Sequence, residues 1–363
     1  MKNIMKIAFV ILGSFALLTS ANAGALDVTG TAKATYSVAG GGSTASANNK
    51  GKAVGITNEL AFTGTGELDN GWSWKYQVEL DDNAAGVTTF DDTRLEVTTD
   101  MGTIAAYNTE GSLNVKYKAS QAAYTTGTDH GTSGGMQYGD NIGLYNNIQL
   151  HTPAGLLPFD MAVKYAFSPS ADKGKNSGNA AGEASALAQG NAAHEYQVSI
   201  APIDGFKLLG SYFEKDEEGG IYKYQTGGVA ATYAYGPVTF GAAFVAVSDN
   251  RAVSDDGIAK TTARGTSNLK AYENTGLSIG YAYNDALSIS VEREESLGYK
   301  RAVSTTGSKD HIDNSVTLSV QTIQAAYTMG GMTLALSAKE IENDDYAEAV
   351  DQSETILAVN MAF

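Results

Sequence analysis

The sequence predicts an all-β chain: a transmembrane antiparallel β-barrel, most simply with 16 strands. Three observations predict this fold. Apolar and polar residues alternate along many short segments, as expected for strands that separate two different environments. The connections between these segments are alternately short and long. After the first residues, no apolar run approaches the length of a membrane helix, which is about 20 residues.

The amino-terminal segment has the features of a secretory signal peptide. It begins with Lys2 and Lys6, continues with the apolar run 7–18 and ends with the small residues 21–23. This order predicts cleavage before Gly24. The predicted organisation is a signal peptide, 1–23, followed by one transmembrane barrel domain, 24–363.

The composition excludes several classes of protein. The chain has no cysteine, so a disulfide framework cannot stabilise it in an oxidising compartment. Its 40 acidic side chains outnumber its 24 lysines and arginines and give a net charge of −16. Because such a charge repels phosphates, nucleic acid is not expected as a partner.

The alternation is clearest in the segment 72–80, where bulky apolar residues alternate strictly with polar ones. Fifteen further segments show the same period, some of them weakly. They are 26–38, 54–62, 93–97, 103–107, 142–152, 159–167, 196–200, 206–212, 229–235, 238–247, 277–283, 287–291, 316–320, 332–338 and 355–363. The resulting strand count is even, as it is in bacterial outer-membrane barrels.

Seven connections are short and contain Gly, Pro, Asn or Asp, which favour tight turns. Eight are predicted to be longer and polar, for example 168–192, 248–270 and 296–313. Because short and long connections interleave, all the short ones lie at one end of the sheet. Bacterial outer-membrane barrels have this arrangement, with short periplasmic turns and long external loops.

A closed barrel also satisfies the membrane, because every backbone polar group then has a partner within the sheet. One face of each strand meets lipid, and the other lines the lumen, the space inside the barrel. Sixteen strands leave an aqueous channel there. The alternation predicts that Ser, Thr, Lys, Gln, Asp and Glu line this channel.

Several segments resemble the Gram-negative general diffusion porins, and among them an alphaproteobacterial type of outer-membrane porin. The run 60–72 and the residues 77–79 resemble the second hairpin of the family, with its glycines, Asn-Gly turn and Gln-x-Glu. Residues 93–95 resemble the next strand, whose arginine faces the pore. Residues 147–153 resemble the strand and proline after the constriction loop, and the terminal Phe363 resembles the family's aromatic end.

The resemblance implies a water-filled channel for passive diffusion of small hydrophilic solutes and ions, present as a homotrimer in the outer membrane. It also implies that the third external loop, predicted at 108–140, folds into the lumen and narrows it, with acidic residues on the loop facing basic residues on the wall. The candidate constriction residues are Glu110, Asp129 and Asp140 on the loop and Lys33, Lys75 and Arg94 on the wall. Phe363 would be the signal read by the barrel-assembly machinery.

The predicted loop differs from the family pattern and leaves one alternative open. It lacks the Pro-Glu-Phe-Gly-Gly motif of many porins and contains Lys116 and Lys118, and Asn58 stands where a second wall arginine often occurs. If the segment 113–117 is a wall strand with a partner, the count rises to eighteen, as in sugar-specific channels. The protein would then be a substrate-selective channel or a structural barrel.

The alternation also assigns charges to the lumen. The basic positions include Lys33, Lys75, Arg94, Lys164, Lys207 and Lys339, and the acidic ones include Asp27, Glu59, Glu79, Glu96, Asp160, Glu195, Glu292 and Glu294. The acidic excess is small, and the external loops add more negative charge. Because such a field raises the local cation concentration, a weak cation preference is predicted.

The sequence contains no clear metal site or catalytic pair. The four histidines, His130, His151, His194 and His311, lack the spacing of a metal site, so no metal or other cofactor is predicted. Acidic pairs such as Asp255-Asp256 fall in predicted external loops, where solvated tips are expected and calcium bridging to lipopolysaccharide phosphates is the alternative. No pairing of serine with histidine points to an enzyme, and no fixed-period repeat points to a solenoid or adhesin.

Overall fold

The computed structural model describes residues 24–41, 50–82, 88–116, 118, 120–126, 136, 138–169, 192–217, 222–249, 269–301 and 312–363. The predicted signal peptide and the constriction candidate Asp129 lie outside these residues. Among the described residues, none of the helices has the length and hydropathy that crossing a membrane requires.

The described chain consists mostly of strands. They are β1 (Leu26–Gly41), β2 (Gly51–Glu67), β3 (Ser73–Asp82), β4 (Thr88–Thr99), β5 (Gly102–Asn108), β6 (Asn147–His151), β7 (Ala162–Ser168), β8 (Ala193–Ile203), β9 (Phe206–Glu217), β10 (Tyr222–Tyr235), β11 (Val238–Asp249), β12 (Leu269–Ala282), β13 (Leu287–Arg301), β14 (Ile312–Met329), β15 (Met332–Glu342) and β16 (Gln352–Ala362). Two short 3-10 helices, η4 (Ile142–Leu144) and η7 (Asp344–Tyr346), lie in connections. The predicted strand 142–152 was therefore wrong in its first half, which holds η4.

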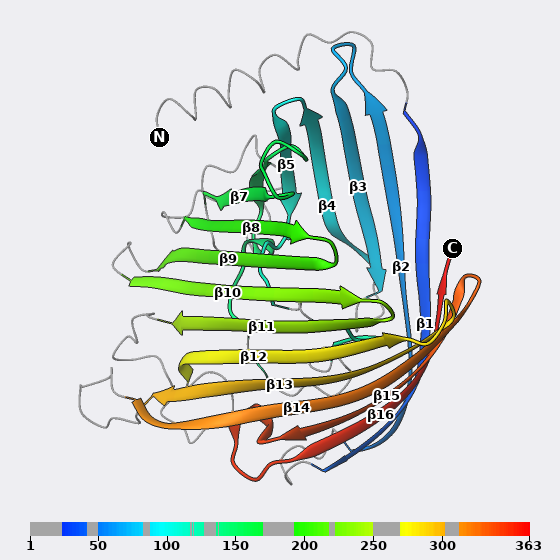
Figure 1. Cartoon of the computed structure of the whole chain (residues 1–363), viewed down its shortest axis with the longest axis vertical. Helices are drawn as coiled ribbons and strands as arrows, with labels where there is room; N and C mark the ends of the chain where they lie inside the picture. Colours follow the sequence, from blue (N-terminus) through cyan, green and yellow to red (C-terminus); the bar gives the residue numbers. More distant parts are fainter. Residues whose placement is uncertain are drawn as a thin grey trace.

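The strands form one closed antiparallel barrel. Each strand pairs with its neighbours in the sequence, and β1 pairs with β16. Figure 1 shows the strands following one another around the wall in chain order. At the seam, the Gly30 amide donates to the Phe363 carbonyl over 2.8 Å, and the Phe363 amide donates to the Gly30 carbonyl over 3.0 Å. The prediction of a 16-strand barrel is confirmed.

The two ends of the barrel differ in their connections. We call the end with the connections 68–72, 100–101, 152–161, 204–205, 236–237, 283–286 and 330–331 the turn end, and the opposite end the loop end. The prediction of eight long loops was wrong for two connections at the loop end, 83–87 and 218–221, which are short. The connection 218–221 is short because β9 and β10 remain paired as far as Glu217 and Tyr222.

Alternate residues on a strand face opposite sides of the wall. On β12, Leu277 and Ile279 are 56% and 51% exposed, whereas Ser278 between them is 5% exposed. Large apolar side chains are also exposed on the outer face of many other strands. Such an outer face is the one that a lipid bilayer requires.

The connection between β5 and β6, residues 109–146, runs inside the barrel, and we call it the inner loop. The backbone amides of Leu113 and Val115 donate to the lumen-facing side chains of Glu195 on β8 and Ser211 on β9. This connection is the third at the loop end, so the prediction that the third loop enters the lumen is confirmed, with wider bounds. Residues 113–116 are not a wall strand, and the barrel has sixteen strands rather than eighteen.

The connection between β15 and β16, residues 343–351, also turns inward at the loop end, and we call it the mouth loop. Tyr346 in this loop is fully buried. Its hydroxyl lies 2.6 Å from the Ser296 hydroxyl on the lumen face of β13. Its ring packs against Gly298, where an added Cβ would come within 2.6 Å of the ring.

The lumen is not wholly polar, which corrects the prediction. Large apolar side chains on the inner face of β9, β11 and β14 are buried in one cluster with residues of the inner loop and Tyr346. They are Phe213, Val245, Val247, Val316, Leu318 and Val320. The alternation identifies the inner face of a strand, but it does not reveal whether water or a folded loop covers that face.

Candidate functional site

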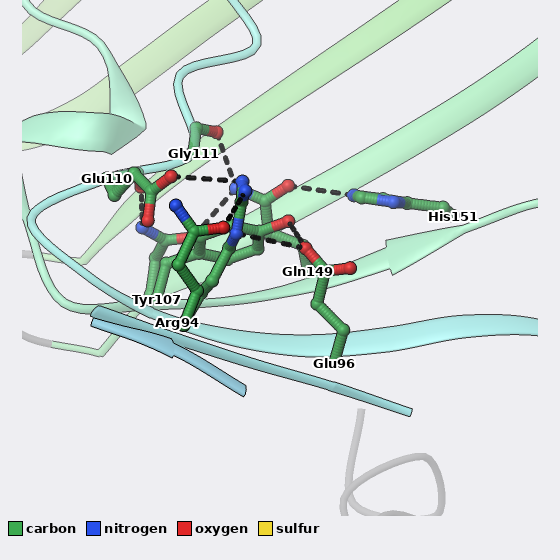
Figure 2. A network of polar contacts seen from close by, with 9 residues as sticks. Arg94, Glu96, Tyr107, Glu110, Gly111, Gln149 and His151 are labelled. Carbon is green, nitrogen blue, oxygen red and sulfur yellow. Dashed lines mark hydrogen bonds and ion pairs between the residues drawn. The ribbon is translucent and has the colours of Figure 1, made fainter. Parts of the chain in front are cut away.

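Arg94 on β4 lies at the centre of a polar cluster where the inner loop leaves the wall (Figure 2). Its Nη1 atom donates to the Glu110 carboxylate over 3.1 Å, and its Nη2 atom donates to Gln77 on β3. The Glu96 carboxylate lies 3.8 Å from the Arg94 Nε atom and accepts a 2.9 Å hydrogen bond from the Tyr107 hydroxyl. We call these five residues the Arg94 cluster. In it, one guanidinium faces two carboxylates, which favours a fixed orientation.

The root of the inner loop is fixed to β6 by two amide side chains. Asn147 donates to the Glu110 carbonyl over 2.9 Å, and Gln149 donates to the Gly111 carbonyl over 2.5 Å. The Gln149 carbonyl lies 2.8 Å from the His151 ring (Figure 2). These contacts hold Glu110 against the wall and explain why it meets Arg94.

The returning end of the inner loop has its own ion pair. The Asp140 carboxylate lies 3.2 Å from the Lys215 ammonium on β9 and accepts a 2.9 Å hydrogen bond from Tyr145. The Asp140 backbone amide donates to the Tyr224 hydroxyl, and its carbonyl accepts from Thr226 on β10. Asp140 is therefore directed at β9 and β10 and not at Arg94.

A buried carboxylate joins the two ends of the inner loop. Glu195 on β8 is fully buried, and its Oε2 atom accepts hydrogen bonds from the amides of Leu113, over 3.1 Å, and Ile142, over 3.0 Å. Charge-assisted bonds of this kind are among the stronger ones in proteins. Glu195 thus positions the inner loop from inside the wall.

The middle of the inner loop crosses to the opposite strands. The Gln121 amide donates to Ser278 on β12 over 3.0 Å. The amides of Tyr124 and Thr125 donate to the Gln324 carbonyl on β14 over 2.8 and 3.0 Å. The inner loop therefore follows the lumen side of the wall from β8 to β14, and its residues Ala123 and Tyr124 also pack against buried residues of β15 and β16.

The structure places the six predicted constriction residues differently. Arg94 and Glu110 are brought together, and Asp140 pairs with Lys215, which the alternation analysis missed. Lys33 on β1 and Lys75 on β3 face the lumen, opposite Thr57 and Thr65 of β2. Asp129 lies outside the described residues.

The structure corrects some positions that the sequence pattern assigned to the lumen or the wall. It also shows partners of the inner loop that the sequence does not mark. Asp160 lies in the exposed turn between β6 and β7 rather than on a lumen-facing strand position. Asn58 faces outward on β2, beside Ala32 on β1. Lys215 could have been found by extending the alternation of 206–212 by three residues. Nothing in the sequence marks Glu195 or Gln324 as partners of the inner loop.

The site consists of charged and polar side chains on the lumen face of the wall and on the inner loop. In the part of the chain that the structure describes, no three His, Cys, Asp or Glu side chains are grouped to hold a metal ion. Arg94 and Lys215 meet carboxylates, whereas Lys33 and Lys75 offer charges to the open space. Such an arrangement can sort solutes by size and charge.

Comparison with known proteins is consistent with this geometry. The sequence model of the family described as Gram-negative porin matches residues 8–321. A comparison with curated proteins finds no match. Three solved structures share the fold: OmpF of Salmonella typhi (TM-score 0.65, 15% identity, 94% of this chain and 98% of that one), OmpT of Vibrio cholerae in its trimer form (0.62, 11%, 94% and 100%) and an anion-selective porin of Comamonas acidovorans (0.58, 12%, 93% and 99%). At these identities, the likeness shows the fold alone.

Proposed function

The chain belongs to the Gram-negative porin family and is an outer-membrane channel for passive diffusion, and we propose that the inner loop sets its narrowest point. One observation carries the proposal. Hydrogen bonds fix the inner loop inside the barrel from Glu195 on β8 to Gln324 on β14. Solutes then pass between this loop and the wall formed by β1 to β4, where Lys33 and Lys75 face the lumen.

The six candidate residues remain the proposed constriction set: Lys33, Lys75 and Arg94 on the wall and Glu110, Asp129 and Asp140 on the loop. Support comes from the Arg94–Glu110 contact and from the lumen-facing positions of Lys33 and Lys75. We expect a weak cation preference in the native channel. Arg94→Glu or Lys75→Glu should strengthen it, as measured by the zero-current potential under a salt gradient. An unchanged potential in both variants would remove these two residues from the constriction.

The channel itself is tested by single-channel recording in a planar bilayer. Purified protein should give discrete current steps in KCl, in groups of three if the channel is a trimer. A properly folded barrel that conducts no ions would contradict the diffusion function. Selective inhibition of the current by one sugar would instead favour the substrate-selective alternative.

We propose a homotrimer on the basis of the outer face of β1 and β2. Val54 and Ile56 on β2 are 76% and 70% exposed near the loop end, whereas the corresponding outer face of β14 and β15 carries Gln321 and Glu340. The outer face of β1 and β2 is thus the more apolar of the two near the loop end, which suits a contact between subunits, and OmpT of Vibrio cholerae, which shares the fold, is described in a trimer form. The double variant Val54→Asp/Ile56→Asp should dissociate the oligomer on a native gel, and Gln321→Asp should not. Dissociation by neither variant would place the contact elsewhere.

We propose the steps of maturation that the sequence predicts. Residues 1–23 direct secretion and are removed, the barrel-assembly machinery reads Phe363, and lipid and lipopolysaccharide surround the outer face. The pairing of Phe363 with Gly30 supports a role of the terminus in closing the barrel.

We propose no enzymatic activity for this chain. The two histidines in the described residues contact Gln149 and the Tyr165 hydroxyl rather than a serine and a carboxylate. This supports a channel without a nucleophile and base.

A further inference from the structure

Polar side chains on three consecutive strands hold the inner-loop segment 121–125 against the wall. The Ala123 amide donates to the Ser290 hydroxyl on β13 over 2.6 Å, between the bonds that neighbouring loop amides make to Ser278 on β12 and Gln324 on β14. Gln324 also donates to a carbonyl of the same segment. Ser290 is paired with Gln324 across β13 and β14, so these acceptors lie side by side. We call Ser278, Ser290 and Gln324 the loop clamp.

Gly280 on β12 allows the backbone of this segment to approach the wall closely. It lies two residues after Ser278, on the same lumen face, and is paired with Ser290 on β13. A Cβ added at Gly280 would come within 2.8 Å of the Gln121 carbonyl oxygen and 3.3 Å of the Gln121 Cβ. Nonbonded carbon atoms prefer separations of about 3.5–4.0 Å. Because a backbone carbonyl cannot swing aside as the end of a side chain can, a larger residue at position 280 has to displace the loop.

Next to the loop clamp, the loop lies on small side chains of the wall. Ala326, Ala335 and Ala358, on β14, β15 and β16, are 4%, 2% and 1% exposed. They belong to one buried cluster, against which Ala123 and Tyr124 of the inner loop pack. Extra atoms in a close-packed cluster force the surrounding groups to shift. The loop is therefore held close to the wall by contacts that leave little room behind it.

The wall behind the loop is more firmly fixed than the loop. Each wall strand is paired with both of its neighbours in the closed barrel, whereas the segment 121–125 is held by single bonds to side chains. The passage lies on the other side of the loop, toward β1 to β4, where Lys33 and Lys75 face the lumen. A group added behind the loop therefore moves the loop toward the passage rather than moving the wall outward.

We propose that Gly280 is a positioning residue that sets the width of the passage from behind the inner loop. The loop clamp holds the segment 121–125 to β12, β13 and β14, and the missing side chain at Gly280 determines how far the loop recedes from the passage. Gly280 acts without touching the solute. Because pore diameter sorts solutes by size, it limits the size of the solutes that pass. This inference rests on the proposed function, in which the inner loop sets the narrowest point.

The test is the uptake of two sugars, the pentose arabinose and the trisaccharide raffinose, by liposomes that contain the purified channel. The ratio of the raffinose rate to the arabinose rate does not depend on how many channels have folded, so a loss of folded protein leaves it unchanged. The ratio should fall in Gly280→Ala and fall further in Gly280→Val. The matched controls are Gly276→Ala and Gly276→Val on the same face of β12. Within the described chain, no atom lies within 4 Å of a Cβ added there, so both controls should keep the native ratio.

An unchanged or higher ratio in Gly280→Val, or an equal fall in Gly276→Val, would overturn the positioning role. Deletion of residues 121–125 tests the proposed function separately, because it should raise the ratio if the inner loop narrows the passage. A raised ratio in the deletion variant with no change in Gly280→Val would reject the role of Gly280 alone. An unchanged ratio in the deletion variant would reject both. If Gly280→Val does not fold, as judged by heat-dependent migration on a gel, the comparison of Gly280→Ala with Gly276→Ala decides.

Discussion

The mouth loop offers the sharpest test of how the lumen is filled. Tyr346 is its anchor, because the ring is fully buried among inward-facing residues of β12 to β14 and the hydroxyl contacts Ser296. Replacing a buried aromatic side chain with alanine removes about 3–5 kcal/mol. The hydroxyl contact accounts for about 1 kcal/mol of this. Tyr346→Ala should therefore lower the ratio of docked to released loop by about a hundredfold or more.

The consequence should be visible in the current through one channel. Because the docked loop occupies space inside the mouth, its release should raise the single-channel conductance of Tyr346→Ala. Tyr346→Phe is the matched control, since it keeps the ring packing and should change conductance little. Heat-dependent migration on a gel verifies that each variant is a folded barrel. Equal conductance of folded Tyr346→Ala and native protein would refute the view that this loop narrows the mouth.

Three further predictions follow from the same contacts. Burial, and then the charge of Asp345, raise the pKa of Asp344 in the mouth loop to about 6. Docking of the mouth loop is therefore favoured below pH 4 and loses stability as the pH rises through about 6. The single-channel conductance should be lower at pH 4 than at pH 7, and Asp344→Asn should abolish this difference. In a urea titration, Val78→Arg on the outer face of β3 should lower the stability of the barrel by about 2–4 kcal/mol if the residue lies near the membrane midplane. The control Thr31→Arg, at a position that faces the lumen opposite Glu59, should lower the stability much less. Equal losses of stability would contradict the assigned faces. Deletion of Phe363 should reduce outer-membrane insertion without reducing secretion, and normal insertion measured by membrane fractionation would exclude its role in assembly.

The pH prediction has a specific structural basis. The Gln352 amide donates to the Oδ2 atom of Asp344, while the Oδ1 atom of Asp344 and the Oε1 atom of Gln352 are both buried without a hydrogen-bond partner among the described residues. A proton on Asp344 supplies the missing donor. Lys339 lowers the pKa of Asp344 but less than burial raises it.

The sequence by itself determined the wall of this protein. Strand faces follow from a period of two, and a one-residue error would place charged groups such as Lys75 in lipid. The same pattern, read along β12, separates Leu277 and Ile279 from Ser278. Turn residues fixed which connections are short, and the chain order of antiparallel neighbours fixed the topology. These features are local, so they can be read from neighbouring residues.

The contents of the lumen were decided by the tertiary structure alone. Glu195 lies more than fifty residues from Ile142 and Leu113, and Gln324 lies about two hundred from Tyr124, so no local pattern links them. The alternation placed Val316 and Leu318 on one face but could not show that the mouth loop covers them. It assigned Arg94 to the lumen, yet its contact with Glu110 depends on Asn147 and Gln149 holding the root of the inner loop. Such contacts form because closure of the barrel brings distant strands around one enclosed space, and that closure is a property of the whole chain.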